Sequence, residues 1–142
     1  DGPGEGAVAE LLARVLREGT AVTLLAYGPM VKTFLQAAEA AAEEGRNLEV
    51  IDLRSLSPLD EDTILASARK TGRVVVVHEA STFLGMGSEI SALITERAFH
   101  HLEAPVLRVG GYNVPYPPSR IEEEFLPDLD RVPDAVDRSL AY

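Results

Sequence analysis

Short hydrophobic runs alternate with amphipathic stretches along the chain. Four segments of four to six residues are rich in aliphatic and β-branched side chains, at residues 22–27, 48–53, 74–77 and 105–109. Their length favours strands over helices, and the first of them stops at a Gly-Pro pair, which is a turn signal. Residues 74–77 are four consecutive valines. Because only a strand covered on both faces is apolar at successive positions, this segment is expected at the middle of a sheet.

Between the strands, apolar residues recur at intervals of three and four, the spacing that lines one face of a helix. Four helices are expected: one after Pro29, one beginning within residues 57–60, one that carries Ile90 and runs to about Leu102, and one from about Asp130. Val132, Val136 and Leu140 are expected to anchor the last helix. Gly45 and Gly72 follow the first two helices, where glycine commonly ends a helix in the left-handed conformation.

Strands that alternate with helices predict right-handed crossovers and a mainly parallel sheet. We expect a three-layer α/β/α fold with a mainly parallel sheet of four to five strands and helices on both faces. Residues 14–142 are expected to form this single domain. Residues 1–13 begin with a polar, glycine-rich stretch and are expected to be a linker or the edge of a longer chain.

Composition and charge indicate which cell compartment and which kinds of partner are expected for the chain. No run approaches the roughly 20 apolar residues of a membrane span, no signal peptide is visible, and cysteine is absent. A reducing cytoplasm without membrane attachment is therefore expected.

The formal net charge of −10 disfavours nucleic acid, whose phosphates are bound mainly through Lys and Arg, and favours a basic partner. Seven acidic residues fall within residues 121–137. They are expected to form either a solvated acidic face or a surface that binds a basic partner.

The pair His78 and Glu79 follows the valine strand, and open α/β sheets hold ligands beyond the carboxyl ends of their strands. An imidazole beside a carboxylate is suited to acid–base chemistry. Neighbours on a strand point to opposite faces, however, so the two side chains act on one atom only if the strand has already ended. A structural or interface role for His78 is therefore favoured over a catalytic one.

Two further patterns invite comparison with ligand sites. Gly85 and Gly87 open a helix as in the phosphate-binding G-x-G-x-x-G loop, but the third glycine is replaced by Ile90. Glu89 in the first helical turn would also repel a phosphate. Close packing is the favoured reason for the glycines, and an independent nucleotide-binding module is the alternative function. The histidines at residues 100–101 do not converge on one metal ion, since helix neighbours lie about 100° apart, so no metal site is expected.

Several motifs, taken in order, resemble one protein family. They lie at residues 51–60, 70–73, 78–80, 87–90, 102–109 and 111–117. Together they resemble the C-terminal, transketolase-type domain of the beta subunit in thiamine-dependent 2-oxoacid dehydrogenases that act on pyruvate or on branched-chain 2-oxoacids. The resemblance covers about residues 19–142. The family usually carries Asp where this chain has Asn113, and the C-terminal domain of a transketolase-like enzyme is the second interpretation.

The resemblance implies that cofactor binding belongs to other parts of the enzyme and not to this domain. The family's complete enzyme is an alpha2-beta2 assembly that decarboxylates a 2-oxoacid on thiamine diphosphate and transfers the acyl group to lipoyl-lysine. Magnesium and thiamine diphosphate belong to the alpha subunit and to the N-terminal domain of the beta subunit. This chain lacks the G-D-G…N pattern that holds them in such proteins. The domain is therefore expected to bind no cofactor and to be inactive in isolation.

The same resemblance implies three partners. These are the alpha subunit, a second beta subunit in a homodimer, and the basic peripheral subunit-binding domain of the lipoyl acyltransferase core. Phe99 and Glu103 are the expected contacts near the end of the third helix. Tyr142 is the third expected contact, and its terminal carboxylate would be native if the chain ends where the family does. The choice between pyruvate and a branched-chain 2-oxoacid stays open.

Overall fold

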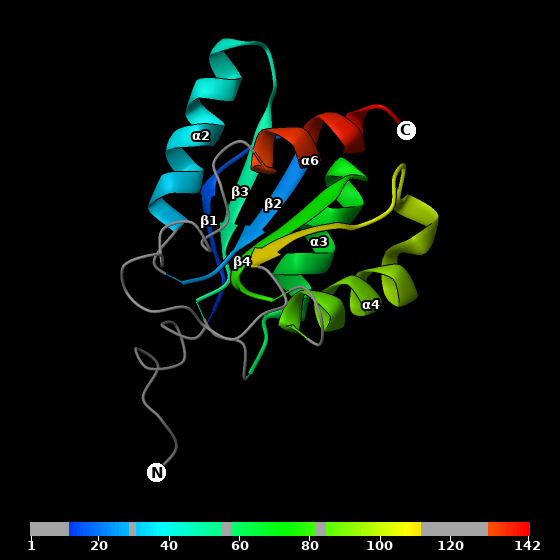
Figure 1. Ribbon diagram of the computed structural model, residues 1–142. Helices are drawn as coiled ribbons and strands as arrows, with labels where there is room; N and C mark the ends of the chain where they lie inside the picture. The colour runs from blue at the N-terminus through cyan, green and yellow to red at the C-terminus, as the bar shows by residue number, and fades with distance from the viewer. Residues whose placement is uncertain (1–11, 29–30, 55–57, 82–84, 112–130) are drawn as a thin grey trace.

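Five strands form one sheet in the part of the chain that the computed structural model describes, residues 12–28, 31–54, 58–81, 85–111 and 131–142 (Figure 1). They are β1 (Arg14–Arg17), β2 (Val22–Ala26), β3 (Leu48–Asp52), β4 (Val74–Ser81) and β5 (Leu107–Gly111). Their order across the sheet is β1-β3-β2-β4-β5, with β1 antiparallel to β3 and the other neighbouring pairs parallel. The mainly parallel sheet is therefore confirmed.

The valine strand does not occupy the place expected for it. It is the fourth strand in the order, and β2 is the middle one. Residues 74–77 are nevertheless fully buried, as a strand covered on both faces requires. β4 also continues to Ser81, beyond the valines, because an apolar run marks where both faces are covered and not where backbone pairing ends.

Strand β1 is absent from the sequence prediction. Its four residues are exposed or half-buried, with Val15 39% exposed, so no apolar run indicates a strand there. It lies at the edge of the sheet, and its register with β3 shifts between Val15 and Arg17. Arg14 is the first residue of β1, and the expected division between a linker and the domain at residue 13 stays a prediction.

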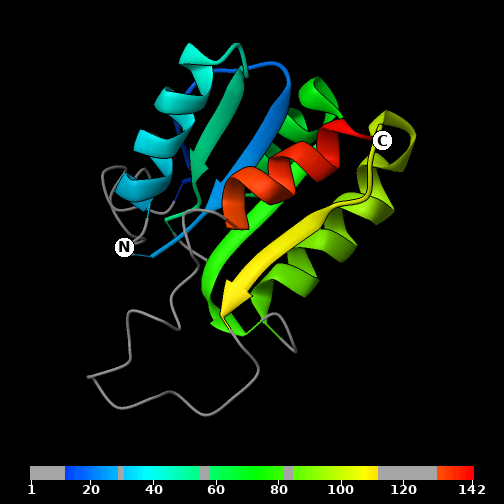
Figure 2. The same ribbon diagram turned by 45° about the horizontal axis from the view of Figure 1, so that its top comes forward.

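Helices cover both faces of the sheet (Figures 1 and 2). Helices α2 (Val31–Glu43) and α6 (Arg131–Leu140) lie on one face, and α3 (Glu61–Thr71) and α4 (Met86–Ala98) lie on the other. Because alternate strand residues point to opposite faces, Leu24 of β2 packs in the core cluster of Phe34, while Leu25 packs in that of Ile64. The three-layer α/β/α fold is therefore confirmed. Of the helices in the described ranges, none is long and apolar enough to cross a membrane.

Helix α3 ends as its sequence predicts but starts slightly later. Asp60 caps its amino end by accepting a backbone hydrogen bond from the first turn, so the helix begins at Glu61, just after the predicted segment 57–60. Gly72 ends the helix with a φ of 70°, the left-handed conformation expected of a C-cap. A Cβ atom on residue 72 would stand 2.9 Å from the carbonyl oxygen of His101. Glycine is therefore required there by both conformation and space.

Helix α4 ends earlier than its apolar periodicity suggests. Ile90, Ile94 and Ala98 are buried on its inner face, as predicted. The α-helix stops at Ala98, and the short 3₁₀ turn η1 (Phe99–His101) continues the chain. This tighter turn leaves the side chain of its first residue, Phe99, 63% exposed. The expected boundary at about Leu102 is therefore the end of η1 and not of α4.

One predicted anchor of α6 is wrong. Val132 and Val136 are each 2% exposed, but Leu140 is 39% exposed. At about 100° per residue, position 139 points within about 20° of the direction of Val132, whereas position 140 points about 80° away. Ser139 is fully buried accordingly, and Leu140 lies at the margin of the buried face.

Candidate functional site

A surface groove gathers the three predicted partner contacts. It encloses about 740 Å³, and its lining includes Thr95, Phe99, Leu102, Glu103, Pro105 and Tyr142. Phe99 begins η1, Glu103 follows that turn, and Tyr142 comes shortly after the end of α6. The fold therefore brings the last residue of the chain next to two residues of a much earlier segment. This feature is named the Phe99–Tyr142 groove.

Two aromatic side chains of the groove are strongly exposed. Phe99 is 63% exposed and Tyr142 70%, the highest values among the large hydrophobic residues in the described part. The rings of Phe99 and His100 meet edge to face, with their centroids 5.6 Å apart. The Glu103 side chain, 64% exposed, adds a carboxylate. Aromatic faces and carboxylates both attract Lys and Arg, so the groove combines apolar contact with two attractions for a basic partner.

Arg73, in the loop between α3 and β4, links Glu103, which lines this groove, to the last turn of α6, which Tyr142 follows. Its Nη1 forms an ion pair with Oε2 of Glu103, and its Nε donates a hydrogen bond to the carbonyl oxygen of Ser139 at 2.9 Å. The side chain of Arg73 is only 17% exposed. Sequence reasoning assigns Arg73 no role, because its two partners follow it by 30 and 66 residues.

His78 lies away from the groove. The groove is lined by residues just before the amino end of β5, such as Pro105, whereas His78 belongs to the carboxyl half of β4. β4 runs through His78 to Ser81, but its register with β5 shifts between Val77 and Ser81. The side chains of residues 78–80 lie outside the described residues. The roles of His78 and Glu79 therefore stay predictions.

The glycine-rich turn before α4 has the local structure expected of a helix start. Gly85 precedes the helix, and its carbonyl accepts a hydrogen bond from the N–H of Ser88 at 3.0 Å. Gly87 is buried in the first turn, and Glu89 stands close to it. A carboxylate at this position complements the positive end of the helix dipole and opposes a phosphate. This geometry suits packing better than nucleotide binding.

The two adjacent histidines do not form part of a metal centre in the described residues. His100 and His101 are both exposed in η1. Within the described ranges, no group of three or more His, Asp or Glu side chains could hold a metal ion. In that part of the chain, His100 contributes to the groove as a ring beside Phe99.

A buried polar cluster that sequence reasoning missed lies between β2, β3 and α3. Glu49 of β3 is 2% exposed, and it accepts hydrogen bonds from Nζ of Lys70 and from the hydroxyl group of Ser67. The hydroxyl group of Thr23 on β2 lies 2.7 Å from that of Ser67 and 2.8 Å from that of Thr71. The pKa of Lys70 is raised above its ordinary value of 10.5, mainly because of the hydrogen bond to Glu49. The cluster fastens the second half of α3 to the sheet.

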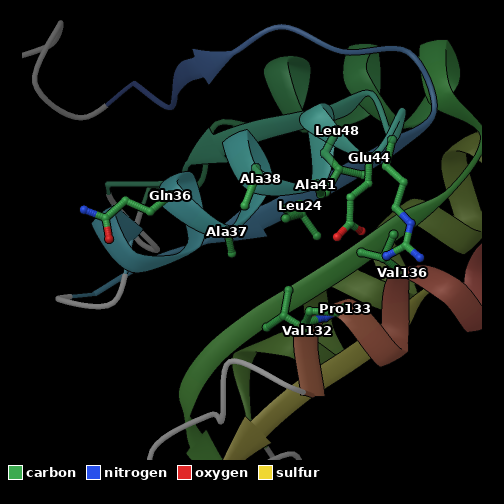
Figure 3. Close-up of a pocket in the computed structure, with 12 residues that line it drawn as sticks. Leu24, Gln36, Ala37, Ala38, Ala41, Glu44, Leu48, Val132, Pro133 and Val136 are labelled. Atoms are coloured by element: carbon green, nitrogen blue, oxygen red, sulfur yellow. The ribbon is translucent and has the colours of Figure 1, made fainter.

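An apolar groove separates α2 from α6 (Figure 3). It encloses about 460 Å³, and most of its lining is aliphatic, including Leu24, Ala38, Ala41, Leu48, Val132 and Val136. Among its lining residues in the described part, the charged ones are Glu44 and Arg46. Arg46 is already paired with Asp137 of α6, at 2.9 Å. The groove therefore offers apolar surface and no set of reactive groups.

The fold and its motifs define a class of protein. Residues 12–132 match the family model described as transketolase, C-terminal domain. The chain therefore belongs to the transketolase C-terminal domain family. The solved structure of a split-gene transketolase, an inactive beta4 tetramer, is similar to it with a TM-score of 0.79 and 32% identity, over 93% of this chain and 42% of that chain.

Beta subunits of 2-oxoacid dehydrogenases are among its relatives. The chain is 54% identical over 130 residues to the pyruvate dehydrogenase E1 component subunit beta of Leifsonia xyli. It is 52% identical over 129 residues to the 3-methyl-2-oxobutanoate dehydrogenase subunit beta of Mycobacterium tuberculosis. These matches cover 92% and 90% of this chain but 39% and 37% of the two relatives, so the chain spans about two fifths of their length. The resemblance to these beta subunits is confirmed.

Proposed function

We propose that this chain is the C-terminal domain of the beta subunit of a 2-oxoacid dehydrogenase complex, where it serves assembly and binding of the acyltransferase core. The parent enzyme carries out oxidative decarboxylation of pyruvate or of a branched-chain 2-oxoacid, with acyl transfer to lipoyl-lysine. The relatives named for both substrates support this parent activity. The observation that carries the binding role is the Phe99–Tyr142 groove, which contains all three residues expected to contact the acyltransferase.

The partner proposed for the groove is the basic peripheral subunit-binding domain of the acyltransferase. The chain carries a formal net charge of −10, which attracts a basic domain over some distance. At close range, the exposed rings of Phe99 and Tyr142 accept apolar side chains and the cationic groups of Lys or Arg. Such charge complementarity raises the association rate and the specificity more than the affinity.

The chain is proposed to leave the cofactor chemistry to other parts of the enzyme. Thiamine diphosphate is bound through its diphosphate and a magnesium ion, which needs oxygen ligands. The described residues do not fit this group, since no cluster of acidic side chains or histidines among them could hold a metal ion. The sequence also lacks the G-D-G…N pattern. The alpha subunit and the N-terminal domain of the beta subunit are the proposed holders.

A second beta subunit and the alpha subunit complete the proposed assembly. The similar split-gene transketolase is a beta4 tetramer, which supports pairing between beta chains in this family. We infer that the chain acts within a homodimer of beta subunits.

Isothermal titration calorimetry of the 142-residue chain with a peripheral subunit-binding domain tests the binding role. We expect binding that weakens with added salt, since the Debye length falls from about 30 Å at 0.01 M to about 8 Å at 0.15 M. Phe99→Ala should weaken binding by more than about 1 kcal/mol if Phe99 is a central contact. Glu103→Gln should flatten the dependence on salt.

Leu12→Ala is the matched control, because Leu12 is also an exposed hydrophobic residue, at 49%. It precedes strand β1, which forms the opposite edge of the sheet from β5. It should bind as the wild-type chain does. A folded wild-type chain that gives no binding heat at low ionic strength, at several temperatures, would remove the acyltransferase from the proposal.

A further inference from the structure

We propose that Arg73 is the positioning residue of the Phe99–Tyr142 groove, because its one guanidinium group holds both Glu103 and the last turn of α6. The inference rests on the proposed binding function of the groove and adds a residue that lies mostly beneath the surface. Arg73 is expected to set the distance between Glu103 and Tyr142 without itself being the main contact of the partner.

The backbone at Arg73 is fixed by the residue before it and by hydrogen bonds to its own carbonyl group. Gly72, the C-cap of α3, precedes it in the left-handed conformation. The carbonyl oxygen of Arg73 accepts hydrogen bonds from the N–H of Thr23 at 2.8 Å and from the hydroxyl group of Thr71 at 2.9 Å. Arg73 therefore starts from a fixed point where α3, β2 and β4 meet.

The first wall that Arg73 holds is the segment after η1. Its Nη1 pairs with Oε2 of Glu103, and the N–H of Glu103 donates to the carbonyl of Gly72 at 2.8 Å. Both the side chain and the backbone of Glu103 are thus tied to the end of α3. The Glu103 side chain still keeps 64% of its surface exposed, so the ion pair orients the carboxylate while leaving it accessible to a partner.

The second wall is formed by Tyr142, which follows the last turn of α6, and Arg73 holds that turn. The final carbonyl groups of a helix lack donors within the helix, and a cation nearby also complements the negative end of the helix dipole. Nε of Arg73 supplies such a donor to the carbonyl of Ser139. Tyr142 follows three residues later, so this bond limits where the Tyr142 ring can lie relative to Glu103.

This arrangement matters for affinity because a partner otherwise has to order the two walls itself. Ordering mobile side chains and chain segments on binding costs free energy, and a surface held in shape beforehand avoids that cost. The guanidinium group is suited to the task, since its planar fork bonds two acceptors in different directions, which the single ammonium of lysine does less well.

The experiment combines hydrogen exchange with calorimetry on the 142-residue chain, using Arg73→Met, Arg73→Lys and the control Arg46→Met. Arg46 also pairs with α6, through Asp137, but it lies on the side that faces α2. In Arg73→Met, the amides of Glu103 and Ala141 should exchange faster, and affinity for the peripheral subunit-binding domain should fall about tenfold, the equivalent of one charge-assisted hydrogen bond. Arg73→Lys should restore part of both effects.

The outcomes separate this inference from the proposed function. If the wild-type chain does not bind, the proposed function fails, and the exchange rates of Glu103 and Ala141 still decide whether Arg73 orders the two walls. Unchanged exchange in both Arg73 variants overturns the inference even when the wild type binds. Equal losses of affinity in Arg73→Met and Arg46→Met also overturn it, because the effect then reflects a loosened α6 and not the groove.

Discussion

Glu49 of β3 and Lys70 of α3 form an ion pair in which the carboxylate side chain is 2% exposed and the lysine side chain is 41% exposed. The pair belongs to the polar cluster that links α3 to the sheet. A buried charge is tolerated only when it is paired and hydrogen-bonded. The ion pair therefore matters for how α3 is seated on the sheet.

Replacing Lys70 by Met should destabilise the fold by about 1–3 kcal/mol, because it leaves the Glu49 carboxylate buried without its cation. The loss is smaller than for a fully buried pair, since the lysine reaches solvent and Glu49 keeps its hydrogen bond from Ser67. Urea denaturation measures the change. Arg97→Met, which breaks the exposed pair of Arg97 and Glu61, is the control and should cost less than about 1 kcal/mol. Equal costs for the two variants would contradict this account.

The same pair predicts how stability depends on alkaline pH. The hydrogen bond to Glu49 raises the pKa of Lys70, so the folded state holds this proton more tightly than the unfolded chain. The resulting stabilisation is complete below the ordinary value of 10.5 and is lost as the pH rises through the raised pKa of the folded state.

The difference in stability between the wild type and Lys70→Met should therefore shrink above pH 10.5, as measured by thermal unfolding. Burial also raises the pKa of Tyr27, which produces an alkaline loss of the same sign in both proteins and cancels in the comparison. A difference that stays constant across this range would show that Lys70 contributes through packing and not through its charge.

Gly72→Ala should cost about 2–3 kcal/mol, since the left-handed conformation penalises a Cβ atom and the carbonyl of His101 would lie 2.9 Å from it. Gly45→Ala is the matched control: Gly45 has a φ of 87° but no neighbour within 4 Å of its Cβ position, so it should cost about 1–2 kcal/mol. Differential scanning calorimetry gives both values. If the two variants unfold alike, the contact with His101 is unimportant.

His78→Ala, made in the complete dehydrogenase assembly, should leave kcat within about tenfold of the wild type, because loss of a general acid–base group typically costs about 10²–10⁴-fold. The reason is the sequence-based expectation that His78 and Glu79, as neighbours on a strand, point to opposite faces and do not act on one atom. Steady-state kinetics measures the effect, with gel filtration to verify that the assembly is intact. A larger fall in kcat with an intact assembly would restore a catalytic role.

The predictions from sequence were most accurate where local periodicity reports burial. The central apolar runs identified the four parallel strands, and the spacing of apolar residues identified the helices, including the end of α3 at Gly72. They failed where burial gives no local signal. Strand β1 has no apolar run because it is an edge strand, and Leu140 repeats an apolar spacing but lies at the margin of the buried face.

The candidate site was predicted only in part. Phe99 and Glu103 lie close together in the sequence, and the resemblance to a family suggested both together with Tyr142. That all three line one groove could not be read from spacing, because Tyr142 arrives through α6 from the far end of the chain. The roles of Arg73 and Glu49 were missed for the same reason, since their partners lie 18 to 66 residues away.

The amino-acid sequence by itself determined the class of fold and the family, because hydrophobic periodicity and short motifs are local properties of the chain. Only the tertiary structure decided which strand is central, which polar residues are buried in pairs, and how Arg73 joins Glu103 to the end of α6. These features depend on contacts between residues that are far apart in the sequence. Such contacts stabilise the fold only after the helices have packed onto the sheet, so no local pattern of residues reports them.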